Sequence, residues 1–340
     1  MLKKIISEQT VEQFRQLFVN AENIVLTAHV NPDGDAIGST LGLSSFLRNM
    51  GKNVNVVLPN GFPDYLAWIK DVGNIVLFNE NQKLAESLVD NADLICCLDF
   101  NELKRIERLG EIIARSGAKK ALIDHHLNPV IDVMASISMP EASSTCELVY
   151  RLIDALGMVD LLDVNGATAL YSGMNTDTGG FTYNSSDPEV FIIVGELMER
   201  GVDKDRVNRF IYNNANLSRL RLMGYVLYKK LEVFAEYNAS LFTLTRDEMK
   251  ELGYVKGDLE GVVNMPLTLK GHKLSISLRD SEDVEGEISV SIRSYDDLPA
   301  NDMAKKYFNG GGHKNAAGGK LWCSMEKARE IAIEAIKDFC

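Results

Sequence analysis

Short, nearly unbroken runs of apolar residues alternate with segments of helical periodicity as far as Pro188. Such runs are typical of strands that are buried on both faces of a sheet. They predict strands at 24–29, 53–58, 74–78, 93–99, 120–124 and 133–137. Between them, apolar residues recur at helical spacing and predict helices that include 36–50 and 102–115. This alternation indicates an α/β domain with a parallel sheet and flanking helices.

The pattern changes after Pro188. A continuously helical and highly charged stretch comes first, and alternation with a period of two follows. It predicts strands at 239–245, 272–279 and 286–293, then a Gly-rich loop and an amphipathic helix over 325–339. We therefore expect a first α/β domain, a helical connector and a smaller α/β domain. Their expected bounds are 1–188, 189–234 and 235–340.

Composition and charge narrow the possible partners. A chain of 340 residues suits two domains better than one core. Its net charge of −12 argues against a protein that coats long nucleic acid, because such binding needs many Lys and Arg side chains on phosphates. The N-terminus turns polar too early for a secretion signal, and no run approaches the ~20 apolar residues of a membrane span. We expect a cytoplasmic protein whose five cysteines, without CxxC spacing, are reduced thiols.

Histidines and aspartates gather where the predicted strands end. The first predicted strand ends at His29 and is followed by Asp33 and Asp35, and Asp99 ends the fourth. The fifth strand leads into Asp124, His125 and His126, and an apolar helix ends at Asp177 before a glycine pair. Any one of these fragments, taken alone, fits a turn, a loop or a helix cap better than a site. However, three of the five histidines lie at these strand ends, and such ends share one crevice in an open parallel sheet.

Aspartate and histidine without cysteine predict a site for divalent cations. This donor set suits Mn²⁺ better than the thiolate-rich sites of structural zinc, and histidine favours Mn²⁺ over Mg²⁺, although Mg²⁺ or Co²⁺ could substitute. A bend at Gly34 would let Asp33 and Asp35 diverge, so that each faces a different ion. Two divalent ions would neutralise the four negative charges of Asp33, Asp35, Asp99 and Asp177. A pair ~3.5–4 Å apart can generate hydroxide and stabilise an in-line displacement at phosphorus.

These motifs resemble the DHH phosphoesterases, a family named after the triplet that stands here as Asp124-His125-His126. The stretch 310–318 resembles the signature of the DHH-associated domain. The resemblance implies two manganese ions, with Asp99 bridging them. It implies His29, Asp33 and Asp99 on one ion, and Asp35, Asp99, His125 and Asp177 on the other. It also implies that His126 acts on the scissile phosphate as a donor or acid, while Asp124 orients a histidine.

The Gly-rich stretch has two interpretations. As a motif alone, Gly310, Gly311, Gly312 and His313 would form a flexible loop. Beside a phosphoesterase centre, they favour a phosphate site in which backbone N–H groups approach the ligand, helped by a following helix N-terminus. The resemblance implies that Arg293, at the end of the preceding strand, contacts substrate. The segment 143–145 caps the helix at 147–156 in one interpretation and contacts phosphate in the other.

Among the branches of this family, the absence of a membrane or sensor segment in the sequence disfavours the membrane-bound cyclic-dinucleotide enzymes. The acidic charge disfavours processive exonucleases, and the Gly-Gly-Gly-His stretch disfavours pyrophosphatases. The remaining hypothesis is an enzyme that hydrolyses very short RNA oligonucleotides to mononucleotides and 3′-phosphoadenosine 5′-phosphate to AMP. The second domain would bind the far end of the substrate. A phosphodiesterase for cyclic or linear dinucleotides stays the alternative, together with a non-catalytic nucleotide sensor, and the resemblance suggests a homodimer.

Overall fold

The computed structural model describes residues 2–255, 257–281 and 284–340, and the chain divides into two compact units. One unit extends to Asn214, and the other runs from Ala215 to Cys340. The division falls within the segment 189–234 that the sequence suggests as a connector. Helices α7 (Pro188–Glu199) and α8 (Lys204–Tyr212) belong to the first unit, and α9 (Leu217–Tyr225) to the second.

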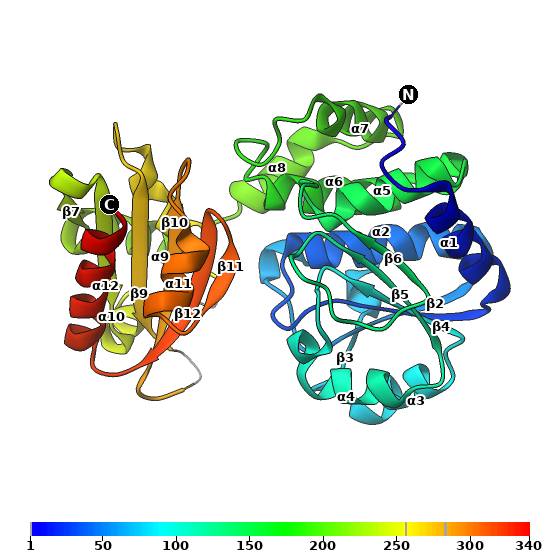
Figure 1. The fold of residues 1–340 in the computed structure, drawn as a ribbon, viewed down its shortest axis with the longest axis horizontal. Helices are drawn as coiled ribbons and strands as arrows, with labels where there is room; N and C mark the ends of the chain where they lie inside the picture. Colours follow the sequence, from blue (N-terminus) through cyan, green and yellow to red (C-terminus); the bar gives the residue numbers. More distant parts are fainter. Residues whose placement is uncertain (1, 256, 282–283) are drawn as a thin grey trace. The chain divides into compact units, whose positions relative to one another are not determined.

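The first unit is built on a six-stranded parallel sheet, in which all six predicted strands are confirmed (Figure 1). The strands are β1 (Asn23–Thr27), β2 (Asn53–Leu58), β3 (Val76–Leu77), β4 (Leu94–Leu98), β5 (Lys119–Asp124) and β6 (Ala135–Ser138). Their order is β3-β2-β1-β4-β5-β6. The chain therefore reverses direction across the sheet between β1 and β4, and ligands of open α/β sheets bind at such a switch point.

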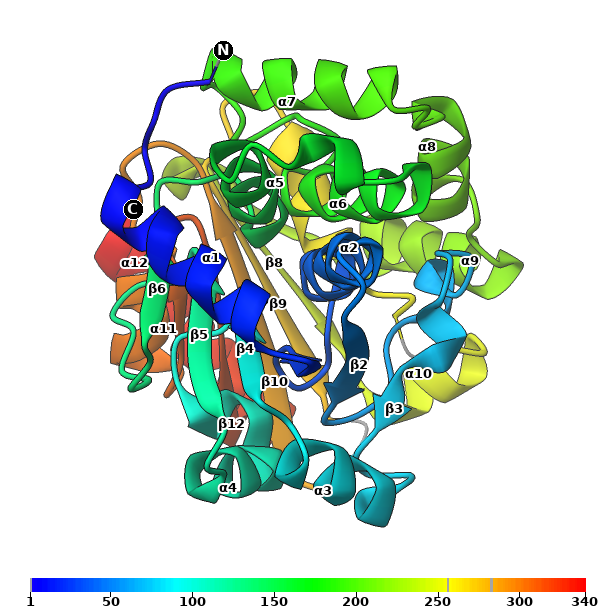
Figure 2. The ribbon, with the colours of Figure 1, turned by 90° about the vertical axis from the view of Figure 1, so that its right-hand side faces the viewer.

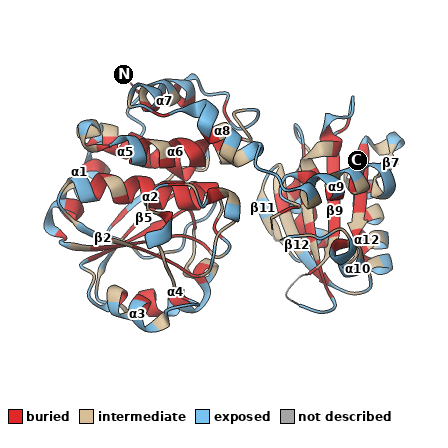
Figure 3. Cartoon of the chain, turned by 180° about the vertical axis from the view of Figure 1, so that it is seen from behind, coloured by how far each residue is buried: buried red, intermediate tan, exposed pale blue. Residues whose placement is uncertain are grey.

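Helices cover both faces of this sheet (Figure 2). One face packs against α1 (Glu8–Asn20), α2 (Gly34–Asn49), α5 (Thr145–Ala155) and α6 (Val164–Asp177). The other packs against α3 (Gln82–Asp90) and α4 (Glu107–Arg115). Alternate residues of each strand enter different cores, since Ile24 and Leu26 face the first set and Val25 the second. The strands and inner helix faces are accordingly buried (Figure 3).

The second unit contains a mixed six-stranded sheet in the order β11-β12-β10-β9-β8-β7. Its strands are β7 (Glu232–Phe234), β8 (Ala239–Leu244), β9 (Leu274–Asp280), β10 (Glu287–Ser294), β11 (Gly311–His313) and β12 (Ala316–Trp322). Within the described part of this second sheet, β8 and β9 pair in parallel and the other neighbouring strands are antiparallel. One face packs against α11 (Ala300–Tyr307) and α12 (Met325–Phe339), and part of the other packs against α9 and α10 (Arg246–Glu251).

Two sequence predictions are wrong in detail. The expected Gly-rich loop is a hairpin of β11 and β12, and a strand follows its turn where we expected a helix N-terminus. The expected helix at 102–115 is a 3₁₀ turn, Leu103–Ile106, followed by α4, because Glu107 has a positive φ of 49° that interrupts the helical backbone. Of the helices in the described ranges, none combines the length and the apolar character needed to cross a bilayer.

Candidate functional site

The predicted site residues of the first unit meet at the carboxyl ends of three adjacent strands. His29 lies two residues beyond β1, Asp99 directly follows β4, and Asp124 ends β5. Asp99 takes a left-handed backbone conformation with φ 64°, and its N–H donates to the oxygen of Ile123 on β5 at 3.1 Å. Left-handed backbone outside glycine is uncommon and gathers at functional sites. The side chains therefore lie at the switch point of the sheet.

One group of donors contains His29, Asp33 and Asp99. His29 Nε2 lies 3.4 Å from Asp99 Oδ2 and 3.9 Å from Asp33 Oδ1. The donor atoms of the three residues all lie within 4.8 Å of one another. His29 and Asp99 are buried, whereas the Asp33 side chain is half-exposed. This spacing suits one cation bound by an imidazole nitrogen and two carboxylate oxygens.

A second group contains Asp35, His125 and Asp177. His125 Nε2 lies 3.5 Å from Asp177 Oδ2 and 3.8 Å from Asp35 Oδ2. These donor atoms also lie within 4.8 Å of one another. The same His125 nitrogen is 3.5 Å from Asp99 Oδ1. The two oxygens of Asp99 therefore face different groups, with Oδ2 towards His29 and Oδ1 towards His125.

The histidines of the two groups present the same ring nitrogen. His29 Nδ1 lies 2.9 Å from the carbonyl oxygen of Val30, and His125 Nδ1 lies 3.2 Å from that of Ala142. A carbonyl oxygen only accepts hydrogen bonds, so Nδ1 carries the proton in each ring. Nε2 then faces the carboxylates, as the ligand nitrogen does in many histidine metal sites.

His126 differs from these two histidines because a carboxylate binds its Nδ1. The distance from His126 Nδ1 to Asp124 Oδ1 is 2.8 Å, and Asp124 is fully buried. Asp99, Asp124 and His126 also lie close enough together to resemble a third cation group. A hydrogen bond already joins two of its donor atoms, so the arrangement favours a role for Asp124 in orienting the His126 ring.

The carboxylates raise the basicity of the histidines. Burial opposes a charge on His29, but its hydrogen bond to Asp99 and the charges of Asp33 and Asp99 outweigh burial and raise its pKa to about 9. Burial likewise opposes a charge on His125, yet Asp177 and Asp99 raise its pKa to about 9. Burial and the charges of Asp33 and Asp99 outweigh the effect of His125 and raise the pKa of Asp177 to about 7. The cluster thus strongly favours bound positive charge, which divalent cations would supply.

The N-terminus of α5 contributes three hydrogen bonds that sequence reasoning did not find, to two of the aspartates. The N–H groups of Thr145 and Cys146 donate to Asp35 Oδ2 and Oδ1 at 2.6 and 2.9 Å. The Thr145 hydroxyl donates to Asp99 Oδ1 at 3.0 Å. Ser144 caps the helix by accepting from the N–H of Glu147, as one sequence interpretation expected. The serines and threonine in the sequence signalled the cap. The contacts with Asp35 and Asp99 join residues that are 110 and 46 positions apart in the sequence, so they left no local pattern.

The expected bend at Gly34 is wrong. Asp33 is the N-cap of α2, Gly34 is its first residue, and Asp35 lies in its first turn. Gly34 does not have the positive φ of a glycine turn. A Cβ at this position would instead collide with the side chain of Thr176 on α6, so glycine is needed for close packing of the two helices. Asp33 and Asp35 diverge because one is extended and the other helical.

In the second unit, the structure brings Arg293 and His313 onto one face of the sheet. Arg293 of β10 lies opposite Ala316 of β12, and Ala316 lies opposite His313 of β11. Opposite residues of antiparallel strands share a face. Two strand spacings of roughly 4.8 Å place the backbones of the two residues about 10 Å apart. The small side chain of Ala316 lies between them on the same face.

The three successive glycines at 310–312, at the start of the hairpin, differ in their surroundings. A Cβ at Gly310 would collide with the backbone of Gly318, and one at Gly312 with that of Ala316. A Cβ at Gly311 would meet nothing within 4 Å. Packing of the strands therefore explains two of the glycines, and only Gly311 borders open space of the kind a ligand needs.

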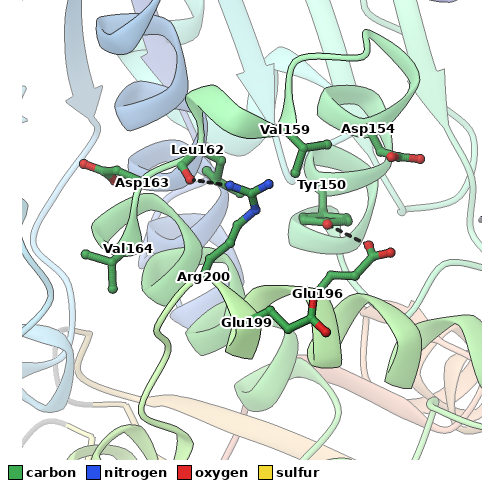
Figure 4. Close-up of a pocket in the computed structure, with 9 residues that line it drawn as sticks. All are labelled: Tyr150, Asp154, Val159, Leu162, Asp163, Val164, Glu196, Glu199 and Arg200. Carbon is green, nitrogen blue, oxygen red and sulfur yellow. Dashed lines mark hydrogen bonds between the residues drawn. The ribbon is translucent and has the colours of Figure 1, made fainter.

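The first unit also has a cavity of about 600 Å³ bordered by α5 and α7 (Figure 4). Two of its polar side chains are paired within it, since Tyr150 donates to Glu196 at 2.7 Å and Arg200 donates to the carbonyl oxygen of Leu162 at 3.3 Å. The predicted metal ligands are not among the residues that line it. The clustered histidine and aspartate donors lie at the strand ends, which are therefore the stronger candidate.

Comparisons with family models and relatives agree with this site. A model described as the DHH family, N-terminal domain, matches residues 23–174, and one described as the DHHA1 domain matches 238–340. The bifunctional oligoribonuclease and PAP phosphatase NrnA of Thermus thermophilus is 31% identical over 325 residues, which cover 93% of this chain and 89% of that protein. The cyclic-di-AMP phosphodiesterase PdeA of Listeria monocytogenes is 24% identical, over 96% of this chain and 49% of that protein.

Solved structures share the fold. An exopolyphosphatase-related protein from Bacteroides fragilis has a TM-score of 0.95 and 46% identity, over 99% of this chain and 98% of that one. RecJ of Thermus thermophilus in complex with Mn²⁺ has a TM-score of 0.56 and 13% identity, over 99% of this chain and 55% of that one. The second likeness shows only that the fold is shared.

Proposed function

The chain belongs to the DHH family of phosphoesterases, and on this premise we propose that it hydrolyses very short RNA oligonucleotides and 3′-phosphoadenosine 5′-phosphate with two manganese ions. The observation that carries the proposal is the position of Asp99, whose two oxygens face two separate groups of histidine and aspartate donors. The Thermus relative is named for both activities. The products would be mononucleotides in one reaction, and AMP and phosphate in the other.

The donor set fits a divalent cation of intermediate hardness, because it combines imidazole and carboxylate and contains no thiolate. The proposed ligands of one ion are His29, Asp33 and Asp99, and those of the other are Asp35, Asp99, His125 and Asp177. When bound, the two ions would supply an activated water and offset the charge of the phosphate. RecJ, which shares the fold, was solved with Mn²⁺, and Mg²⁺ or Co²⁺ could substitute.

The chain's own groups would handle the proton and the far end of the substrate. Asp124 binds Nδ1 of His126 and so orients the ring, and in its protonated form the ring would donate from Nε2 to a phosphate oxygen or to the leaving oxygen. In the second unit, Arg293 and His313 share a face and would bind a second phosphate or the adjoining nucleoside. Gly311 borders the open space that such a ligand needs.

A competition assay tests the proposal. The protein is given Mn²⁺, 5′-phosphorylated dinucleotide, 3′-phosphoadenosine 5′-phosphate, cyclic dinucleotide and pyrophosphate together, and products are separated by chromatography. We expect mononucleotide and AMP. Asp99→Asn is the control, because asparagine tolerates the left-handed backbone at this position but lacks the charge. Full activity of this variant would refute the site, and turnover of pyrophosphate alone would refute the substrate.

A second candidate is hydrolysis of cyclic dinucleotides, which the likeness to the Listeria cyclic-di-AMP phosphodiesterase favours. The chemistry at phosphorus would be the same, and only the ligand of the second unit would differ. Turnover of the cyclic compound alone in the same assay would select this candidate. Binding without turnover of any substrate would instead support a nucleotide sensor.

A further inference from the structure

Thr145 contacts both groups of proposed metal ligands from one position. It is the first residue of α5 and is fully buried. Its N–H donates to Asp35 Oδ2 at 2.6 Å, while its hydroxyl donates to Asp99 Oδ1 at 3.0 Å. The hydroxyl takes no part in capping the helix, because Ser144 already serves as the cap. The hydrogen bond of this buried hydroxyl therefore goes to the carboxylate of Asp99, 46 positions away in the sequence.

The contact fixes how the Asp99 carboxylate is turned. Asp99 Oδ2 lies 3.4 Å from His29 Nε2, and Oδ1 lies 3.5 Å from His125 Nε2. A rotation about the last bond of the side chain would take both oxygens away from these positions. The Thr145 hydroxyl binds only Oδ1 and so opposes this rotation.

The first turn of α5 is itself firmly held. Glu147 accepts hydrogen bonds from both the N–H and the hydroxyl of Ser143 at 2.7 Å. Arg151 binds Glu147 and also Glu189 of α7, at 2.7 Å in each case. These side chains are buried, and this network fixes the position from which Thr145 donates.

We propose that Thr145 is a positioning residue that holds the Asp99 carboxylate between the two donor groups, so that it can bridge two ions. The inference rests on the proposed two-metal function and names a residue outside the proposed ligand set. Loss of a hydrogen bond to a ligand from outside the coordination sphere weakens metal binding by about 10–100-fold. Removal of the Thr145 hydroxyl is expected to have an effect of this size.

Three variants of the full chain test the proposal by Mn²⁺ binding alone, without substrate. Thr145→Val removes the hydroxyl with little change of shape, Thr145→Ser keeps it, and Ser144→Ala weakens the same helix without touching either carboxylate. Isothermal titration gives the affinities. Electron paramagnetic resonance shows whether two bound Mn²⁺ ions are magnetically coupled, as a shared carboxylate predicts.

We expect Thr145→Val to bind Mn²⁺ about 10–100-fold more weakly and to lose the coupled signal, while Thr145→Ser and Ser144→Ala keep it. Equal weakening in Ser144→Ala would refute the proposal, because stability of the helix would then be the cause. Unchanged affinity and coupling in Thr145→Val would refute it as well. If the unaltered protein bound no Mn²⁺ pair, the proposed function would fail, and that result is distinct from either of these.

Discussion

Gly34→Ala tests whether close packing of α2 and α6 positions the candidate metal ligands. The added Cβ would lie 2.7 and 2.8 Å from Cγ2 and Cβ of Thr176, and closer still to its hydroxyl. Carbon atoms pack best at about 3.5–4.0 Å, so the two helices must separate by about 1 Å. Overpacking of this kind costs about 1–3 kcal/mol. Because Gly34 lies between Asp33 and Asp35, and Thr176 precedes Asp177, we also expect weaker Mn²⁺ binding.

The matched control is Gly195→Ala in α7. Gly195 is an exposed glycine within a helix, and its Cβ would meet nothing within 4 Å. Alanine should therefore stabilise the protein by about 0.5–1 kcal/mol. The chain has two tryptophans, with Trp68 in the first unit and exposed Trp322 in the second. In a Trp322→Phe background, urea unfolding followed by tryptophan fluorescence reports on the first unit alone.

The two substitutions are the same chemically and should shift the unfolding midpoint in opposite directions. If Gly34→Ala stabilised the first unit as Gly195→Ala does, close approach of the helices would not be the reason for glycine at position 34. If it destabilised the unit but left Mn²⁺ affinity unchanged, the packing argument would stand and its link to the metal ligands would be refuted.

Three further predictions concern other parts of the chain. Gly311→Ala should leave stability unchanged but weaken substrate binding, whereas Gly310→Ala should destabilise the second unit by at least about 1 kcal/mol, as thermal unfolding and KM would show. Arg151→Ala leaves two buried carboxylates without their cation and should cost about 3–5 kcal/mol in urea unfolding. Burial opposes the charge of Glu248, but its hydrogen bonds from Lys230, the Thr245 N–H and Tyr225 together outweigh burial and lower its pKa to about 2. Glu248→Gln should therefore destabilise the protein above pH 4.5, and its difference from the unaltered protein should vanish as the pH falls towards 2.

The first sheet was predictable because its strands are buried on both faces. Runs such as Leu94–Leu98 contain no charged residue, and the aspartate or histidine at the end of such a run, here Asp99, is visible in the sequence. The parallel arrangement then implied that these ends meet. Every predicted donor of the first unit does lie in the cluster.

Features that depend on tertiary contacts were not predictable. The strands β11 and β12 are rich in glycine, which disfavours strands, and only packing against Phe308 and β10 reveals their role. The sequence around Gly34 looks the same whether the glycine is needed for a turn or for close packing of two helices. The hold of α5 on Asp35 and Asp99 likewise depends on where a distant helix begins.

The proposed ligands also bear on the order in which the protein assembles. They come from separate segments between His29 and Asp177, brought together by β1, β4, β5 and the end of α6. No short stretch holds a complete donor group, so an unfolded or partly synthesised chain would bind cations poorly. During synthesis the centre could form only after α6 had emerged from the ribosome. Metal binding would then come late and would stabilise the native state over the unfolded one, because the unfolded chain competes weakly for the same ions.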